Sequence, residues 1–221
     1  MRQRGRMLIT AGSTHERIDA VRYLANRSSG RVGVYLAAAA HTAGWSVTLL
    51  AGPDVPAPPK GVRTLRFEST ADLAKRLAEE FCSCDVLIMA AAVADYRPRR
   101  VSRGKLPRRA GRLVLELDPT PDLVAHCAEQ KRAEQRIVGF ALEEAHAVVR
   151  RAQRKLRKKE LDAIVGNPLE TMGSDRIQAV VYTAAGETVW PPSRGASGLS
   201  KAAFARWLIR WIGADLMAPR V

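Results

Sequence analysis

Short apolar runs alternate with longer stretches of helical character along most of the chain. Apolar runs bounded by turn residues predict buried strands, here over 7–12, 45–52, 62–68, 85–96, 112–118, 136–142 and 161–167, with a hairpin over 177–191. The stretches between them predict helices over 31–44, 69–81, 120–132, 143–160 and 199–216. Gly44 is expected to end the first helix, and Ser69 or Thr70 to cap the second. Thr120 is expected to cap the third, with Pro121 at its first helical position.

This alternation of strands and helices predicts a Rossmann-like, three-layer α/β fold: a mostly parallel central sheet, helices on both faces and a C-terminal hairpin. In such sheets ligands bind beyond the carboxyl ends of the strands, so the strand ends at Gly12, Gly52 and Asp95 should line the site. Residues 1–221 show no repeat and no domain boundary, which favours a single domain. The basic segment 97–112, with its prolines and glycines, is expected to be an exposed flap.

Composition narrows the class of partner. The net charge of +14 suggests an anionic ligand. Arg outnumbers Lys by 28 to 8, so much of the charge is compositional, and with 5% aromatic residues no specific nucleic-acid partner is expected. No leader peptide and no apolar run long enough for a membrane span is present, which predicts a cytoplasmic protein. Cys82, Cys84 and Cys127 form no CxxC pair and are expected to be buried or half-buried thiols.

The turn after the first predicted strand contains only Gly12, whereas a dinucleotide-binding turn needs three spaced glycines and an immediate helix. An NAD(P)-binding oxidoreductase is therefore disfavoured. Ser28, Ser29 and Gly30 come later, directly before the Ala-rich helix. Hydroxyls and free backbone N–H groups at a helix N-terminus favour a phosphate. The alternative is that one of the two serines merely caps the helix.

Four further positions carry candidate chemistry. Asp95 follows a central strand, where a carboxylate can bind magnesium directly or through water, or can cap a turn. Lys105 lies in the basic flap, where a solvated charge is the plain alternative. Lys155 and Lys159 are four residues apart and so share one helix face. By itself that pair is typical of a basic last turn that complements the helix dipole.

Together these pieces resemble the phosphopantothenate–cysteine ligases, also called phosphopantothenoylcysteine synthetases. The resemblance runs from about Met7 to Leu216 and rests on ordered motifs, which are specific as a set. They are TAGSTHERIDAVRYLANRSSGRVG (10–33), AAAVADYRP (90–98), PDLV (121–124), VGFALE (138–143) and KLRKKELDAIVGN (155–167), with LSKAAFARWLIRWI (199–212) at the end.

The resemblance implies a step of coenzyme A biosynthesis. A nucleoside triphosphate with magnesium, CTP in most bacterial members, activates 4′-phosphopantothenate. The amine of cysteine then attacks the acyl-cytidylate, giving phosphopantothenoylcysteine, CMP and pyrophosphate. It also implies a homodimer with flap segments near the partner's site. Many bacterial members are fused behind a flavin-dependent decarboxylase. Because this chain begins at the ligase's first strand, we expect no FMN on it and a separate phosphopantothenoylcysteine decarboxylase in the cell.

The resemblance also implies roles for single residues. Asn26 matches the asparagine that handles the acyl-cytidylate, Arg22 a neighbouring functional arginine, and Lys105 the first lysine of a K-x-K-K flap motif. The matched nucleotide-binding positions are Asp95, Pro121, Asp122, Leu123, Val124, Phe140, Lys155 and Lys159. They join a phosphate cradle of Gly12, Ser28, Ser29 and Gly30, with Asp95 as the magnesium ligand.

The chain departs from the family pattern at a few positions. Pro107 and Arg108 stand where the flap motif has lysines, which leaves Lys105 as the flap's only lysine. Ser13 replaces a usual proline, and Ile177 stands where asparagine is common. The first departure could alter the stiffness of the flap and the rate of reaction. A basic nucleic-acid-binding protein, the other rival to the ligase, is favoured by the net charge alone.

Overall fold

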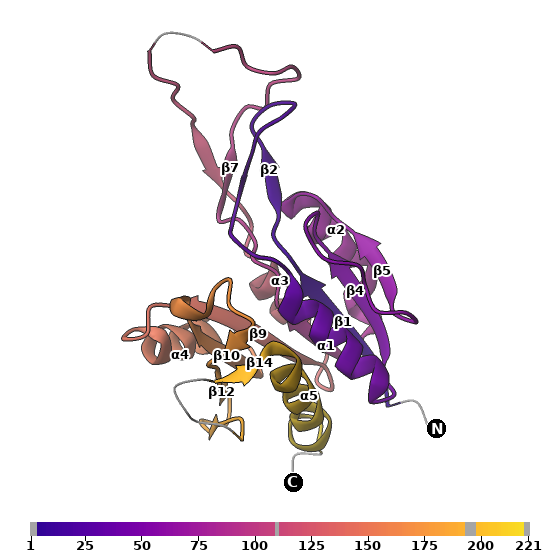
Figure 1. The fold of residues 1–221 in the computed structure, drawn as a ribbon. Coiled ribbons are helices and arrows are strands. Elements are labelled where there is room, and N and C mark those ends of the chain that lie inside the picture. The colour runs from indigo at the N-terminus through magenta and orange to yellow at the C-terminus, as the bar shows by residue number, and fades with distance from the viewer. Residues whose placement is uncertain (1–3, 109–110, 193–197, 219–221) are drawn as a thin grey trace.

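The computed structural model describes residues 4–108, 111–192 and 198–218. Its centre is one eight-stranded sheet (Figure 1). Listed from edge to edge, the strands are β13 (Thr188–Val189), β12 (Val180–Thr183), β10 (Ala163–Pro168), β9 (Arg136–Glu143), β6 (Val86–Met89), β1 (Arg6–Ala11), β4 (Ser46–Ala51) and β5 (Arg63–Arg66). The strands from β10 to β5 pair in parallel, and β12 and β13 add an antiparallel hairpin. The predicted mostly parallel sheet with a C-terminal hairpin is confirmed.

Helices cover both faces of this sheet. On one face lie α1 (Arg31–Thr42) and α5 (Lys201–Trp211), and on the other lie α2 (Thr70–Glu80), α3 (Leu123–Glu129) and α4 (Val148–Lys158). Short helical turns follow α2, β10 and α5, as η1 (Phe81–Ser83), η2 (Leu169–Thr171) and the π-turn η3 (Ile212–Leu216). Successive strand residues point to opposite faces, so Ile9 packs beneath α1 and α5 while Leu8 packs on the side of α2. Two apolar cores thus hold the three layers together.

The predicted helix ends are partly right. Ser69 caps α2 in a reciprocal capping box with Asp72, and Gly44 follows α1 with a φ of 87°, as expected. The prediction for α3 was wrong: Asp122 is its N-cap, because the Thr120 hydroxyl donates to the carbonyl of Ala94 instead. Pro121 therefore lies outside the helix, which ends at 129 rather than 132.

Two other predicted elements were too long. The helix expected over 143–160 is α4, which begins only at Val148 because Glu143 is still part of β9. The strand expected over 112–118 is reduced to β8 (Leu117–Pro119). The apolar residues Leu113, Val114 and Leu115 are exposed, since this segment lies beyond the sheet and pairs with no strand among the described residues.

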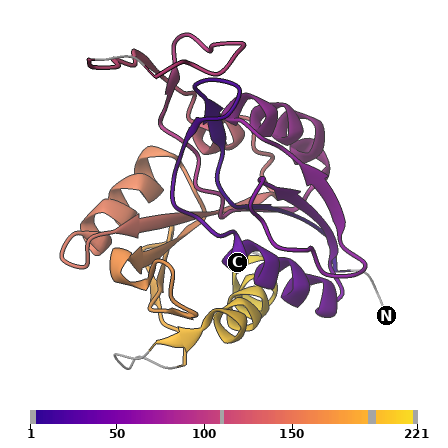
Figure 2. The same ribbon diagram turned by 45° about the horizontal axis from the view of Figure 1, so that its top comes forward.

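Two hairpins extend away from the sheet (Figures 1 and 2). One pairs β2 (His15–Arg17) with β3 (Tyr23–Ala25), and the other pairs β7 (Tyr96–Pro98) with β8. The first follows β1 and the second follows β6, and because β1 and β6 are neighbours in the sheet, the hairpins rise side by side. We call them together the arm (15–25 and 96–119); the flap is its outer part. A further small pair, β11 (Arg176–Ile177) with β14 (Leu199–Ser200), lies beside α5.

Two of the three cysteines are buried. Burial raises the pKa of the Cys84 and Cys127 thiols to about 12 and about 11. Cys82 is exposed, against the expectation of burial, because it lies in the surface turn η1. Within the described parts of the chain, no helix is long and apolar enough to cross a bilayer.

Candidate active site at the carboxyl edge of the sheet

The turns after β1 and before α1 meet at one edge of the sheet. Gly12 (φ 87°) ends β1 and Gly30 (φ 67°) precedes α1. A Cβ on Gly30 would lie 3.0 Å from the Gly12 nitrogen, and one on Gly12 would lie 2.5 Å from a methyl of Val55. Both positions therefore need glycine, for the left-handed backbone and for the close approach. The structure thus brings together two stretches that the sequence marked separately as candidate binding turns.

The N-cap residue of α1 is Gly30, so the alternative of a capping serine at Ser28 or Ser29 was wrong. Among the described residues, no side chain accepts a hydrogen bond from the first turn of this helix. Ser28 is half-buried and Ser29 exposed beside this end. Its free N–H groups and the helix dipole favour an anion, in keeping with the predicted phosphate cradle.

Two cations lie at the same end of α1. Arg31 pairs with Asp175 at 2.5 Å, and the backbone N–H of Lys201 donates to the carbonyl of Asp175 at 3.0 Å. Burial first, and then the charge of Arg31, lower the pKa of Lys201, whose residue is only 8% exposed. Lys201 is not among the residues predicted from the sequence; its place directly after the helix cap Ser200 was the available signal.

The loop after β6 is hydrogen-bonded to residues on either side of the β2–β3 hairpin. The Asn26 amide donates to the carbonyl of Val93 at 2.8 Å, and the Ala94 N–H donates to the Thr14 hydroxyl at 2.9 Å. Asp95 follows and is exposed; its carbonyl accepts from the Thr120 N–H. Among the described residues nothing donates to the Asp95 carboxylate, so the alternative role of a turn cap has no support.

Within the described ranges, no group of three or more acidic, histidine or cysteine side chains could hold a metal ion by itself. Magnesium commonly binds one or two carboxylates together with substrate phosphates. The exposed carboxylate of Asp95 fits that manner of binding, in which the cation arrives with a nucleotide.

Asp19 joins the two hairpins of the arm. Its buried carboxylate accepts from the N–H of Leu106 at 3.0 Å and from the Arg22 guanidinium at 2.6 Å. Lys105 precedes Leu106, is exposed, and has no side-chain partner among the described residues. The arrangement brings Arg22 to the base of the loop that carries Lys105. Asp19 was not predicted from the sequence as a site residue. An aspartate three residues before an arginine in a turn was a usable signal of their ion pair.

Lys155 of α4 and Lys159, the C-cap residue of this helix, are held by carboxylates. Lys155 contacts Glu143 at 2.7 Å, with Arg151 on the other carboxylate oxygen at 2.9 Å, and Lys159 contacts Asp122 at 2.9 Å. Burial tends to raise the pKa of Glu143, but its bonds from Lys155 and Arg151 outweigh this and lower it. The lysines thus form specific pairs as well as a basic last turn, and Glu143 was not predicted from the sequence as the partner of Lys155.

The predicted nucleotide positions fall on both faces of the sheet. Phe140 packs on the face of α1, as do the Gly12 and Gly30 turns, whereas Leu123 and the α4 helix that carries Lys155 pack on the other. Asp122 caps α3 and Val124 lies in its first turn on that second face, with Pro121 directly before the cap. The two groups can meet only around the edge of the sheet. A ligand that touches both must therefore cross that edge, as expected for an extended molecule.

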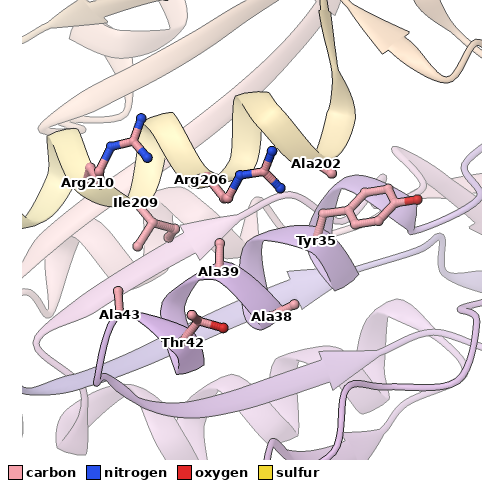
Figure 3. Close-up of a pocket in the computed structure, with 9 residues that line it drawn as sticks. All are labelled: Tyr35, Ala38, Ala39, Thr42, Ala43, Ala202, Arg206, Ile209 and Arg210. Carbon is pink, nitrogen blue, oxygen red and sulfur yellow. The ribbon is translucent and has the colours of Figure 1, made fainter.

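A groove of about 280 Å³ lies elsewhere, between α1 and α5 (Figure 3). Small side chains such as Ala39 and Ala43 form much of its wall, and Arg206 and Arg210 project from α5. None of the predicted site residues lines this groove. The candidate site is therefore the open edge of the sheet and the base of the arm.

Sequence comparison finds relatives of this chain. The family model of the DNA/pantothenate metabolism flavoprotein C-terminal domain matches residues 2–215. A cysteine/cysteine sulfinic acid decarboxylase from an unknown prokaryotic organism is 41% identical over 170 residues, which are 76% of this chain and 47% of that protein. The coenzyme A biosynthesis bifunctional protein CoaBC of Bacillus subtilis is 38% identical over 169 residues, covering 76% and 41%. The chain spans about half the length of these curated relatives.

Solved structures share the fold. The C-terminal domain of a coenzyme A biosynthesis bifunctional protein CoaBC matches with a TM-score of 0.82 and 34% identity, over 98% of both chains. A Cab2 variant in complex with phosphopantothenate-cysteine matches with a TM-score of 0.80 at 18% identity, over 98% of this chain and 89% of that one, which shows the fold. By the match of nearly its whole length, the chain belongs to the DNA/pantothenate metabolism flavoprotein C-terminal domain family.

Proposed function

We propose that this chain joins 4′-phosphopantothenate to cysteine with CTP, through an acyl-cytidylate, in coenzyme A biosynthesis. The observation that carries the proposal is the match over 98% of both chains to the C-terminal domain of CoaBC. The phosphopantothenate-cysteine bound to Cab2 supports the class of substrate. The reaction is proposed to take place in the cytoplasm.

The site residues supply groups suited to both half-reactions. The substrate carboxylate attacks the α-phosphorus of CTP and pyrophosphate leaves; the cysteine amine then attacks the acyl carbonyl and CMP leaves. Negative charge that develops on phosphoryl oxygens is stabilised by fixed donors and cations. The free N-terminus of α1, Arg31 and Lys201 stand at one side of the edge, and Lys105 in the flap at the other. Asp95 would hold the magnesium that accompanies the nucleotide, a cation that neutralises phosphate charge.

Lys155 and Lys159, at the C-terminal end of α4, are proposed to contact the nucleotide from the second face of the sheet. Glu143 and Asp122 hold the ammonium groups of Lys155 and Lys159 in place before any ligand arrives. Holding a cation in advance lowers the entropy lost when a phosphate or ribose oxygen meets it.

The direct test is incubation of the protein with phosphopantothenate, cysteine, magnesium and each nucleoside triphosphate in turn, followed by mass spectrometry. Phosphopantothenoylcysteine, with one CMP and one pyrophosphate per product, is the expected outcome. A protein that is folded by circular dichroism and yields no product with any nucleotide would contradict the proposal.

CTP is expected to be used in preference to ATP. Asn167 lies at the end of β10, and its side-chain oxygen accepts from the Thr171 hydroxyl at 2.9 Å, which orients its NH₂ group. That group has no partner among the described residues and can donate to a pyrimidine oxygen. A pocket that hydrogen-bonds one base leaves polar groups unpaired with another, so we expect kcat/KM to favour CTP by roughly 10² or more. Asn167→Ala should reduce this ratio. Equal turnover with ATP in the unaltered protein would count against the assignment.

The arm is proposed to form the contact of a homodimer. Most of the large apolar side chains that are exposed in the described residues belong to it, namely Val21, Tyr23, Leu24, Tyr96, Val101, Leu113, Val114, Leu115 and Leu117. Val114 is 78% exposed. A gathering of exposed apolar side chains on one extended part of the molecule is typical of an interface, and a second copy would bring the same side chains to it.

We therefore expect two copies per particle by light scattering, and one for Val114→Glu, because a carboxylate cannot be buried cheaply in an apolar contact. Val149→Glu is the matched control, since Val149 is a half-exposed valine on α4, away from the arm. A wild-type protein that is monomeric at micromolar concentration, or a Val114→Glu variant that stays dimeric, would contradict this contact.

A further inference from the structure

The carboxylate of Asp19 is fully buried and accepts four hydrogen bonds. Its Oδ1 accepts from the N–H groups of Val21 and Arg22, both at 2.8 Å, within its own hairpin. Its Oδ2 accepts from the Arg22 guanidinium at 2.6 Å and from the N–H of Leu106 at 3.0 Å. The same guanidinium donates to the Leu106 carbonyl at 3.3 Å. One oxygen thus shapes a local turn, and the other ties down a residue 87 positions away in the sequence.

This contact closes one side of the loop that carries the flap lysine. On the other side, the Ser102 N–H donates to the carbonyl of Ile18, three residues before Lys105. Between these two fastenings only residues 103–105 are unattached to the first hairpin, and all three are exposed. A loop this short has few accessible positions for the Lys105 backbone. Removing the Asp19 contact would free one end of it.

We infer that Asp19 is a positioning residue that fixes the Lys105 loop and the Arg22 guanidinium against the base of the arm. The inference about Lys105 and Arg22 rests on the proposed function, whereas the contact itself does not. Burial tends to raise the pKa of Asp19, but the N–H bonds from Val21, Leu106 and Arg22, with the Arg22 charge, outweigh this and lower it. The carboxylate is therefore ionised at neutral pH. Its contribution to stability is present above the ordinary value of 3.8 and is lost only on acidification below it.

The variant Asp19→Asn tests the roles of the two carboxylate oxygens separately. Asparagine keeps one acceptor for the Val21 and Arg22 N–H groups, so the local turn should survive. Its NH₂ group replaces Oδ2 and cannot accept from Leu106 or from the guanidinium. The matched control is Glu116→Gln, a change of carboxylate to amide in the same arm. Among the described residues, the one ion pair of Glu116 is a 3.9 Å surface contact with Arg99.

Hydrogen exchange at the Leu106 N–H measures its contact with Asp19 in the absence of substrate. In the wild-type chain the Leu106 N–H should exchange more slowly than those of Arg103 and Lys105, which have no acceptor among the described residues. A hydrogen bond to a charged group that is lost should speed exchange at Leu106 about tenfold or more in Asp19→Asn. Trypsin cleavage after Lys105 should quicken in parallel. Glu116→Gln should match the wild type in both measurements.

The enzymatic measurement follows in the same proteins. Because a misplaced group loses interactions made in the transition state, kcat for acyl-cytidylate formation should fall about tenfold or more in Asp19→Asn, with KM for CTP nearly unchanged. Equal thermal midpoints for the two variants would set aside a general loss of structure. If Asp19→Asn does not fold, the exchange rate of the Leu106 N–H in the wild type still decides whether the contact with Asp19 exists.

The outcomes are distinct. A Leu106 N–H that exchanges as fast as that of Lys105 in the wild type, or at an unchanged rate in Asp19→Asn, overturns the contact. Faster exchange with an unchanged kcat overturns the positioning role. If the wild type makes no acyl-cytidylate while Leu106 is protected and released as expected, the proposed function fails and the contact stands.

Discussion

Lys105→Gln is expected to abolish formation of the acyl-cytidylate while leaving the fold intact. Lys105 is the only lysine of the flap and its side chain is exposed, without a partner among the described residues. An exposed charge of this kind contributes little to stability, so the thermal midpoint should stay near the wild-type value. A mobile ammonium that meets the phosphoryl oxygens only in the transition state contributes to rate instead, on the order of 10²–10³ for one lost donor. Pyrophosphate release measures the first half-reaction directly.

Arg103→Gln is the matched control for Lys105, since it neutralises another exposed cation of the same loop. It should release pyrophosphate at nearly the wild-type rate. Lys105→Arg is expected to recover little activity, because a planar guanidinium does not replace a compact ammonium. Near-normal pyrophosphate release by Lys105→Gln would remove Lys105 from the chemistry.

Asn26→Asp is expected to stop the second half-reaction and to accumulate phosphopantothenoyl-cytidylate. Asn26 has two amide hydrogens; one goes to the Val93 carbonyl, and the other has no partner among the described residues. The free hydrogen can polarise the acyl carbonyl for attack by cysteine, and losing such a donor costs about 10²–10³ in rate. Mass spectrometry should show the trapped intermediate, with little product even at high cysteine.

The contact with Val93 changes how this variant has to be judged. From the sequence, a purely structural Asn26 predicts a mild effect of aspartate, because aspartate caps and turns nearly as well. In the structure, aspartate would place a carboxylate against a carbonyl oxygen, so a loss of stability is expected in either case. Asn26→Ala removes the same hydrogen bond without adding charge. If Asn26 is only structural, both half-reactions should slow alike in Asn26→Ala, and no intermediate should accumulate in either variant.

Elements with a clear periodic pattern and local signals could be predicted from the sequence. The capping box at Ser69 and the glycine after α1 are encoded within a few residues, and β1 and β4 are apolar runs that the sheet buries on both faces. Pattern alone failed at 112–118, where apolar alternation typical of a strand occurs in the exposed arm. The hairpin of β2 and β3 escaped notice because its strands have three residues each and are largely polar or exposed.

The candidate site was predictable as a set of residue types, and its arrangement was not. Nothing local indicates that Gly12 and Gly30 touch, or that a carboxylate at Asp19 reaches the N–H of Leu106. The same holds for the pairing of Lys159 with Asp122, which depends on how α3 and α4 pack on one face. Such contacts follow from the order of strands in the sheet, which the sequence leaves open.

The order of the helices along the chain also affects how the nascent chain folds. The apolar face of α1 is synthesised before α5, the helix that covers it, and every strand from β4 to β14 is made in between. Until Phe204 and Leu208 are in place, Leu36 and Ala40 have no helix above them. A chain interrupted before Lys201 would keep this face bare, which is the kind of surface that chaperones and proteases act on. The docking of α5 on α1 is therefore the step that removes this apolar face from solvent.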